Sequence, residues 1–272
     1  MKKFATFVMA VLLSIGSLSV FAAAEDEINV TLRIEGVDEN FYYDTVTTTD
    51  TNLGDFLEQL GSDNDNINIV MEDGGYGRYL TEVNGDKAAS YGAYSGWLFI
   101  VNGADPGTGM DNVMLKDGDE VVLYYGDPYG AGFQFPEADL SDIENGVITF
   151  TSKDTVYDEN YNPSVVVNPV ENAVVKWYSD DAGFTEYTTD AEGRITIDKE
   201  LLTNGEHKVT IERYDDTGVP TVLRFAPDYT VAVDTDIETA DFADPAVYAG
   251  VMAAMAVIFA GAIISKKEAY ER

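Results

Sequence analysis

The chain has 272 residues with no cysteine and a single histidine. Without cysteine there is no disulfide, no thiolate nucleophile, no cysteine zinc site and no attachment point for a lipoprotein anchor. The one histidine, His207, falls in a predicted strand, where a lone imidazole is more typical of a surface or packing residue than of a catalyst. We therefore expect no catalytic residue and no metal site.

Basic residues are also scarce, since 16 lysines and arginines face 49 acids and give a net charge of −33. A phosphate backbone would be repelled by such a chain, which excludes nucleic acid as a natural partner. A solvated acidic face that keeps the protein soluble accounts for this balance. A role in binding calcium or a cationic ligand is the alternative.

The common catalytic and metal motifs are missing as well. The run Asp63-Asn-Asp-Asn66 begins like a calcium loop, but Ile67, Asn68 and Gly74 stand where an EF-hand needs an Asp or Asn, a glycine and a glutamate. The glycines of residues 74–77 precede no helix and no phosphate-binding lysine. No serine lies in a Gly-x-Ser-x-Gly elbow. The sequence predicts a protein that is not an enzyme and has no cofactor.

Both ends carry apolar segments. Residues 1–24 join two lysines, an apolar run and three alanines, the pattern of a signal peptide, with a retained anchor as the alternative. Residues 246–264 carry no charge and would span about 28 Å as a helix, enough for one bilayer core, and Lys266 and Lys267 mark the cytoplasmic side. A buried core helix is the alternative. We expect a single-pass cell-membrane protein with an extracellular N-terminal ectodomain, an acidic stalk over residues 235–245 and a cytoplasmic tail over residues 265–272.

The sequence of the first half of the ectodomain predicts several strands and one helix. Residues 27–34 alternate apolar and polar side chains, as in a half-buried strand. Residues 51–61 have a helical apolar stripe, with Thr51 or Asn52 as the cap and Gly61 as the stop. Asn84-Gly85 and Asn102-Gly103 are turn signals. Two strands, a helix and further strands predict a β-grasp-like α+β domain over residues 25–130; the other strands are expected at 41–49, 67–71, 78–83, 96–101 and 120–125.

The second half predicts almost only strands. After a linker over residues 131–145, short strands separated by turns fill residues 146–234 and predict an antiparallel β-sandwich. The stretch 188–197 resembles a turn of bacterial immunoglobulin-like and prealbumin-like surface modules, which implies that Gly193 makes the turn and Ile197 is buried. Trp177 is expected in the core. The strands are expected at 147–152, 164–167, 173–178, 194–197, 207–214, 221–225 and 229–233.

Three stretches of the first half carry sequence patterns similar to those of a known family. Residues 75–85 read "GYGRYLTEVNG", residues 92–103 read "GAYSGWLFIVNG", and residues 115–125 read "LKDGDEVVLYY". Together they resemble the bacterial relatives of the carboxy-terminal β domain of transcobalamin and intrinsic factor, with Val83 and Phe99 in place of the usual isoleucine and tyrosine. The resemblance implies a β-grasp-like fold and binding of a corrinoid or another flat ligand through the region of Ser95 to Trp97. The helical domain that covers the other face of the ligand in the animal carriers has no counterpart here.

Alternation along residues 96–101 divides their side chains between two faces. Trp97, Phe99 and Val101 share one face, and Leu98 and Ile100 share the other. We expect Leu98 and Ile100 to pack on the helix, which leaves Trp97 and Phe99 as either a second covered face or an open platform. Our hypothesis is the platform, with the ligand-binding residues Tyr76, Tyr79, Tyr91, Tyr94, Trp97 and Phe99.

These observations predict a membrane-anchored, cell-surface protein that binds a ligand. The ligand would be a corrinoid, such as cobalamin, or another flat nutrient, captured for uptake and handed to a membrane transporter. The alternative is a non-enzymatic adhesion or structural protein of the cell surface that binds a protein or a glycan.

Overall fold

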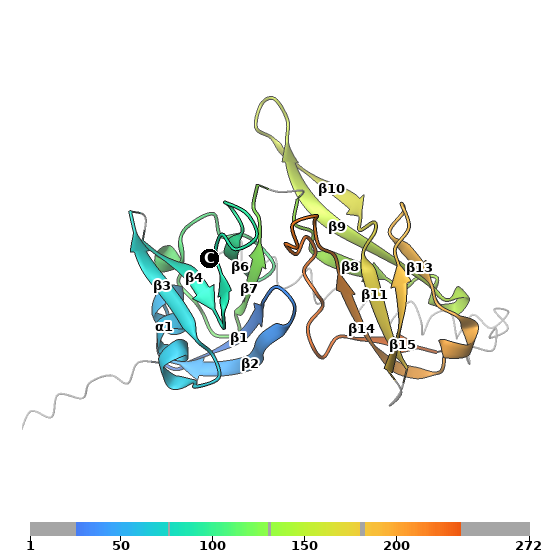
Figure 1. Ribbon diagram of the computed structural model, residues 1–272, viewed down its shortest axis with the longest axis horizontal. Coiled ribbons are helices and arrows are strands. Elements are labelled where there is room, and N and C mark those ends of the chain that lie inside the picture. Colours follow the sequence, from blue (N-terminus) through green and yellow to red (C-terminus); the bar gives the residue numbers. More distant parts are fainter. Residues whose placement is uncertain (1–25, 76, 130–131, 180–182, 235–272) are drawn as a thin grey trace, which may run out of the picture.

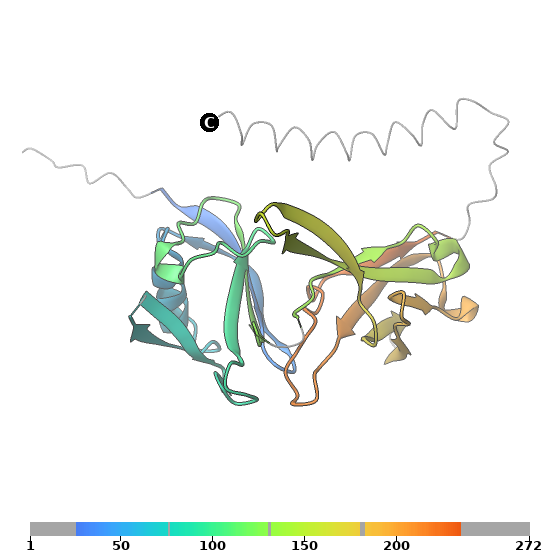
Figure 2. The ribbon, with the colours of Figure 1, turned by 90° about the horizontal axis from the view of Figure 1, so that it is seen from above.

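The structure is a computed structural model that describes residues 26–75, 77–129, 132–179 and 183–234. The described chain is mostly β and contains several antiparallel sheets. It forms two modules that lie side by side, an N-terminal module of β1 to β7 and a C-terminal module of β8 to β15 (Figures 1 and 2). The predicted signal peptide, stalk, membrane segment and tail lie outside the described residues. Within the described ranges, no helix has the length and apolar character needed to cross a membrane.

The N-terminal module is built on a four-stranded sheet in the order β2-β1-β7-β6. β1 and β7 are parallel, and the other neighbours are antiparallel. A smaller antiparallel sheet, β3-β4-β5, lies beside it. The elements are β1 (Ile28–Glu35), β2 (Asn40–Thr48), α1 (Leu53–Asp63), β3 (Ile69–Gly74), β4 (Gly77–Val83), β5 (Asp86–Lys87), β6 (Gly96–Val101), the short helix η1 (Met110–Asn112) and β7 (Glu120–Gly126).

Helix α1 begins where the sequence predicts. The Asn52 side chain caps it by accepting hydrogen bonds from the backbone N–H groups of Gly54 and Asp55. The expected stop at Gly61 is wrong, because the helix continues to Asp63. Gly61 instead permits a close approach to β3, since a Cβ added there would lie 3.1 Å from the Cβ of Ile69. The predicted apolar stripe is buried and consists of Leu53, Phe56, Leu57 and Leu60.

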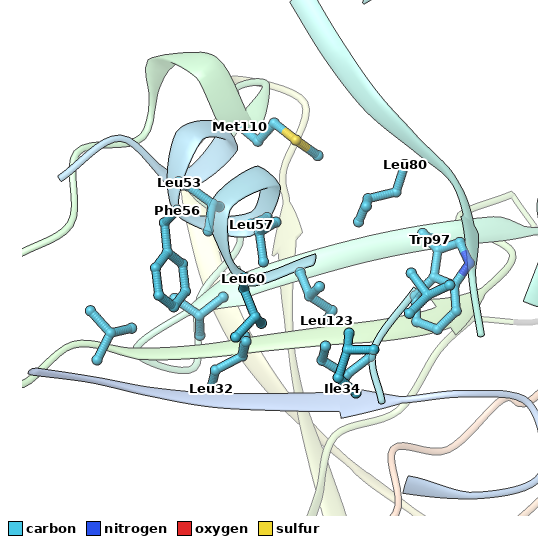
Figure 3. Packing of buried hydrophobic residues seen from close by; sticks show 14 of the residues in the cluster. Leu32, Ile34, Leu53, Phe56, Leu57, Leu60, Leu80, Trp97, Met110 and Leu123 are labelled. Atoms are coloured by element: carbon cyan, nitrogen blue, oxygen red, sulfur yellow. The ribbon is translucent and has the colours of Figure 1, made fainter. Parts of the chain in front are cut away.

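The core of this module lies between α1 and the large sheet (Figure 3). Trp97, Phe99 and Val101 point into it, while Leu98 and Ile100 point to the opposite face of the sheet. The expectation that Leu98 and Ile100 pack on the helix is therefore wrong. Both faces of β6 are apolar and both are covered, so alternation alone could not tell which face meets the helix.

Both Asn-Gly pairs are turns, as predicted. Asn84 and Gly85 have φ values of 49° and 101°, and Asn102 and Gly103 have φ values of 52° and 75°. Asparagine and glycine are the residues that enter this left-handed region most readily.

The C-terminal module has two sheets around a second core. One has the order β10-β9-β13, with β8 also paired to β9, and the other has the order β12-β11-β14-β15. Trp177 and Ile197 are buried in this core, as predicted. The elements are β8 (Pro136–Asp139), η2 (Ile143–Asn145), β9 (Val147–Tyr157), β10 (Pro163–Pro169), β11 (Val174–Ser179), β12 (Gly183–Thr188), β13 (Arg194–Thr196), η4 (Lys199–Leu201), β14 (Gly205–Glu212) and β15 (Thr230–Val233).

Three features of this module differ from the sequence prediction. Strand β12 pairs with β11 where no strand was expected. Strand β8 lies inside the range expected to be a linker and pairs with β9. Residues 221–225 are not a strand, and Val222 makes only an isolated bridge to Gln134. Leu223 and Arg224, from this segment, contact the N-terminal module.

Gly193 makes the predicted turn with a φ of 76°. A Cβ at this position would collide with the carbonyl oxygen of Phe150 and lie 3.1 Å from the backbone nitrogen of Val170. Glycine is therefore required for two reasons, its dihedral angle and the close approach of the backbone of β9 and of the residue after β10.

The junction between the modules is apolar at one end and charged at the other. Ile100, Val122 and Tyr124, on the outer face of the large sheet, pack with Leu223 in a third buried cluster, which Leu98, Phe133 and Phe135 extend. At the charged end, the Arg224 guanidinium donates to the Glu35 carboxylate at 3.0 Å. It also donates to the backbone oxygens of Gly36, Val37 and Glu39 in the β1–β2 turn.

Candidate ligand-binding surface

The aromatic segment before β6 is held by a buried network. Ser95 is 3% exposed; its Oγ accepts a hydrogen bond from the Tyr91 N–H, donates to the Gly92 carbonyl and lies 3.1 Å from the Tyr125 hydroxyl. The Tyr125 hydroxyl donates to the Lys87 carbonyl at 2.6 Å. This network fixes the backbone of the loop on the sheet, so the direction in which a side chain projects from it is set before any ligand arrives.

Tyr94 is that projecting ring. Its side chain is 64% exposed and meets Tyr129, which is 79% exposed, edge to face with 5.1 Å between ring centroids. Tyr129 comes from the glycine-rich loop after β7, where its N–H donates to the Asp127 carboxylate at 2.8 Å. Two exposed rings from separate loops thus form a small aromatic surface, which we call the Tyr94–Tyr129 pair.

The structure places the other members of the predicted segment differently. Trp97 is 9% exposed, and its indole N–H donates to the Asp86 carbonyl at 2.8 Å. Phe99 is half-buried against the same core. The platform hypothesis is wrong for both rings, because α1 and β4 require an apolar face of β6 to pack on.

Tyr91 lies at the edge of the module junction. Its ring packs edge-on against Tyr125, with 5.9 Å between centroids, and stands beside Gly218 of the C-terminal module. Burial raises the pKa of its hydroxyl, and the charges of Asp38 and Asp86 raise it further. Tyr91 therefore contacts both its own module and the C-terminal module.

Tyr79 is exposed on β4, and its hydroxyl donates to the Glu72 carboxylate at 3.1 Å. That hydrogen bond raises the pKa of Tyr79. No ring contact links it to Tyr94 or Tyr129 among the described residues. Tyr76 lies outside the described residues.

Two hollows in the described surface lie away from these rings. One, of about 400 Å³, lies between the end of α1 and β3, where Glu58, Met71 and Arg78 line it. Another, of about 560 Å³, lies at the side of the C-terminal module, where Asn168 and Arg213 line it. Across the described ranges, no three side chains of histidine, cysteine, aspartate or glutamate are grouped so as to hold a metal ion.

The predicted site does not include Tyr129. The sequence signal that could have included it is the spacing of a tyrosine inside a glycine-rich loop, directly after a strand that pairs with the Trp97 strand. Pairing of β6 with β7 brings the loop before β6 to the same sheet end as the loop after β7. Tyr94 and Tyr129 therefore meet across a strand pair.

The family model and the solved structures that resemble this protein match only part of its chain. A family model described as a domain of unknown function (DUF4430) matches residues 56–127. No curated protein matches the chain. Among solved structures, haptocorrin in complex with Cbi is similar at 20% identity and a TM-score of 0.34, over 38% of this chain and 26% of haptocorrin. A candidate metal binding protein from Ruminococcus gnavus is similar at 25% identity and a TM-score of 0.31, over 38% of this chain and all of that protein. The chain thus spans about a quarter of haptocorrin.

Proposed function

We propose that this protein is a non-enzymatic binding protein of the cell surface, whose N-terminal module receives a flat ligand on the Tyr94–Tyr129 pair. The observation that carries the proposal is the exposure of these two rings, which meet from separate loops, one of them held on the sheet by the buried Ser95 network. Exposed aromatic rings without an apolar cover are the surfaces on which planar molecules stack.

The fold supports the same proposal. A mixed sheet with a parallel central pair and one helix on its face is the arrangement of a β-grasp domain, and two sheets around Trp177 fit an antiparallel sandwich of immunoglobulin-like or prealbumin-like kind. The family resemblance in residues 75–125 implies a corrinoid as the flat ligand. The net charge of −36 over residues 25–245, from 11 bases and 47 acids, disfavours an anionic ligand.

The size of the pair limits its affinity. An aromatic side chain has a surface of about 200 Å², so the exposed fractions of 64% and 79% give the pair roughly 300 Å² of exposed surface that a ligand can bury. That area contributes about 7 kcal/mol at 25 cal/mol per Å², against an association cost of about 4 kcal/mol or more. The pair alone therefore supports a dissociation constant near the millimolar range, and tight capture needs a second protein that closes over the ligand.

The place of the protein in the cell forms part of the proposal. Residues 1–24 would direct export, and residues 246–264 would anchor the modules outside the membrane, close to a transporter that accepts the ligand. Extraction of the membrane fraction with alkaline carbonate tests the anchor. A protein released with the soluble fraction would contradict it.

Titration of the full-length protein in mild detergent with dicyanocobinamide, followed by equilibrium dialysis to about 30 mM, tests ligand binding, since the area estimate implies a dissociation constant of about 6 mM. We expect saturable binding that the Tyr94→Ser/Tyr129→Ser double variant abolishes. The matched control is Tyr161→Ser, which removes a tyrosine that is 86% exposed in the other module. Absence of saturable binding, or equal binding by the double variant, would contradict the proposal.

A further inference from the structure

A second exposed surface lies on the β9–β10 hairpin, far from the Tyr94–Tyr129 pair in the sequence. At its base, the inward side chains Ile148, Phe150 and Ser152 are fully buried. Beyond Ser152 the two strands continue as a ribbon whose loop projects past both modules (Figure 1). An isolated two-stranded ribbon is only marginally stable in water, so a projecting hairpin of this length calls for a reason.

The ribbon exposes valines on both of its faces. Val165 and Val167 are 65% and 56% exposed on the outer face, and Val156 and Val166 are exposed on the inner one. Strand β10 reads "PSVVVNP" and contains no charged residue. Valine favours extended backbone, which suits a strand, but it gains nothing from lying bare in water.

Strand β10 is also an open edge. Of the described strands it pairs only with β9, in an unbroken antiparallel register from Pro163 to Pro169. Proteins usually blunt an edge strand with charges, bulges or internal prolines. The edge strand of the other sheet follows that rule, since β12 carries Glu186 and its Phe184 ring lies 5.4 Å from the Lys176 ammonium. Strand β10 has prolines only at its two ends.

The loop at the end of the hairpin is ordered. The Asp158 carboxylate accepts hydrogen bonds from the N–H groups of Asn160 and Asn162 and from the Asn162 side chain, all within 2.9 Å. Tyr161 has a φ of 62°, an unusual angle for a bulky residue, and its ring is 86% exposed. The loop therefore holds an exposed tyrosine next to the exposed acids Asp158 and Glu159.

Charge decides which strand can add to this edge. The hairpin carries Asp154, Asp158 and Glu159, and its one base, Lys153, is paired with Glu137 at 2.6 Å. A second copy of the chain would bring another strongly acidic surface, whereas a strand with lysine or arginine would be attracted. We propose that β10 and the adjoining loop form a docking edge for an extended, basic and apolar segment of a partner protein, which adds as a further strand beside β10.

Hydrogen–deuterium exchange of the full-length protein in mild detergent tests this proposal. The probe is a synthetic ten-residue peptide of alternating lysine and valine. We expect it to slow amide exchange in residues 163–169, and we expect the Val165→Thr/Val167→Thr variant, which keeps β-branched side chains, to bind about tenfold more weakly. The matched control Phe184→Thr changes the other edge strand and should bind the peptide as the parent does.

A peptide of alternating glutamate and valine separates charge from mere apolar contact and should not bind. Equal binding of both peptides would overturn the proposal, as would protection outside the hairpin or no binding at about 1 mM. Sedimentation of the protein alone gives one further outcome. A concentration-dependent dimer that the valine variant abolishes would assign the edge to a second copy and overturn the basic partner.

Discussion

Removal of Arg224 is expected to loosen the two modules from one another. The side chain is 12% exposed, and its partner Glu35 is 4% exposed, so Arg224→Met would leave a buried carboxylate without its nearest cation. Breaking a buried ion pair from one side costs about 3–5 kcal/mol. Glu35 keeps a hydrogen bond from Asn40 at 3.1 Å and has Arg33 at 3.6 Å, which places the expected loss near the lower limit, about 3 kcal/mol.

Urea unfolding of the full-length protein in mild detergent measures this loss. The chain has two tryptophans, Trp97 in the N-terminal module and Trp177 in the C-terminal module, so Trp97→Phe and Trp177→Phe parents report the modules separately. We expect the two transitions to coincide in the parent and to separate in Arg224→Met. The N-terminal transition should move to lower urea, because the buried Glu35 belongs to that module.

Lys153→Met is the matched control. Lys153 and Glu137 are as close as 2.6 Å, but their side chains are 55% and 57% exposed, and such pairs contribute less than about 1 kcal/mol. Adding Glu35→Gln to Arg224→Met should recover part of the loss, since the unpaired charge is then gone. Equal losses in Arg224→Met and Lys153→Met, with coincident transitions in both, would refute the reasoning.

Three further predictions follow from single sites. Burial raises the pKa of Tyr124 to about 12, so the folded protein keeps this proton while the unfolded chain loses it above about pH 10. The free energy of unfolding should therefore fall between pH 10 and 12, by at most about 1.4 kcal/mol per pH unit for this group. Denaturant titrations at each pH should show a shallower fall in Tyr124→Phe. Gly54→Ala should lower the melting temperature although alanine favours helix, because its Cβ would lie 2.5 Å from the Asp111 carboxylate and 2.6 Å from the Arg78 guanidinium. Moving these groups apart would break the hydrogen bond of 2.6 Å that joins them, so a rise in melting temperature would contradict the packing. Gly193→Ala should cost about 2 kcal/mol or more in urea unfolding, and a neutral result would show that the turn can relax.

Local signals in the sequence predicted much of the fold. The Asn52 cap, the stripe of α1 and the two Asn-Gly turns depend on neighbouring residues, and all are present. The face of β6 could not be predicted in the same way, since Trp97 and Leu98 lie on opposite apolar faces and the cover of each face comes from distant chain.

Long-range contacts also account for what the sequence left out of the site. Tyr129 joins Tyr94 only because β6 and β7 pair, and Tyr91 contacts Gly218 only because the modules meet. No periodicity signals that Arg224, 189 positions after Glu35, will bind the β1–β2 turn. Whether the aromatic residues bind a ligand stays a prediction.

The separation of Glu35 and Arg224 along the chain also sets an order of events in biosynthesis. Ribosomes make the N-terminal strands first, and Ile100 and Val122 must wait for Leu223 and Arg224 before their face of the sheet is sealed. Until then, the nascent polypeptide exposes the apolar outer face of this sheet, which can associate with other chains. A chaperone that shields this face until translation nears its end would prevent premature association.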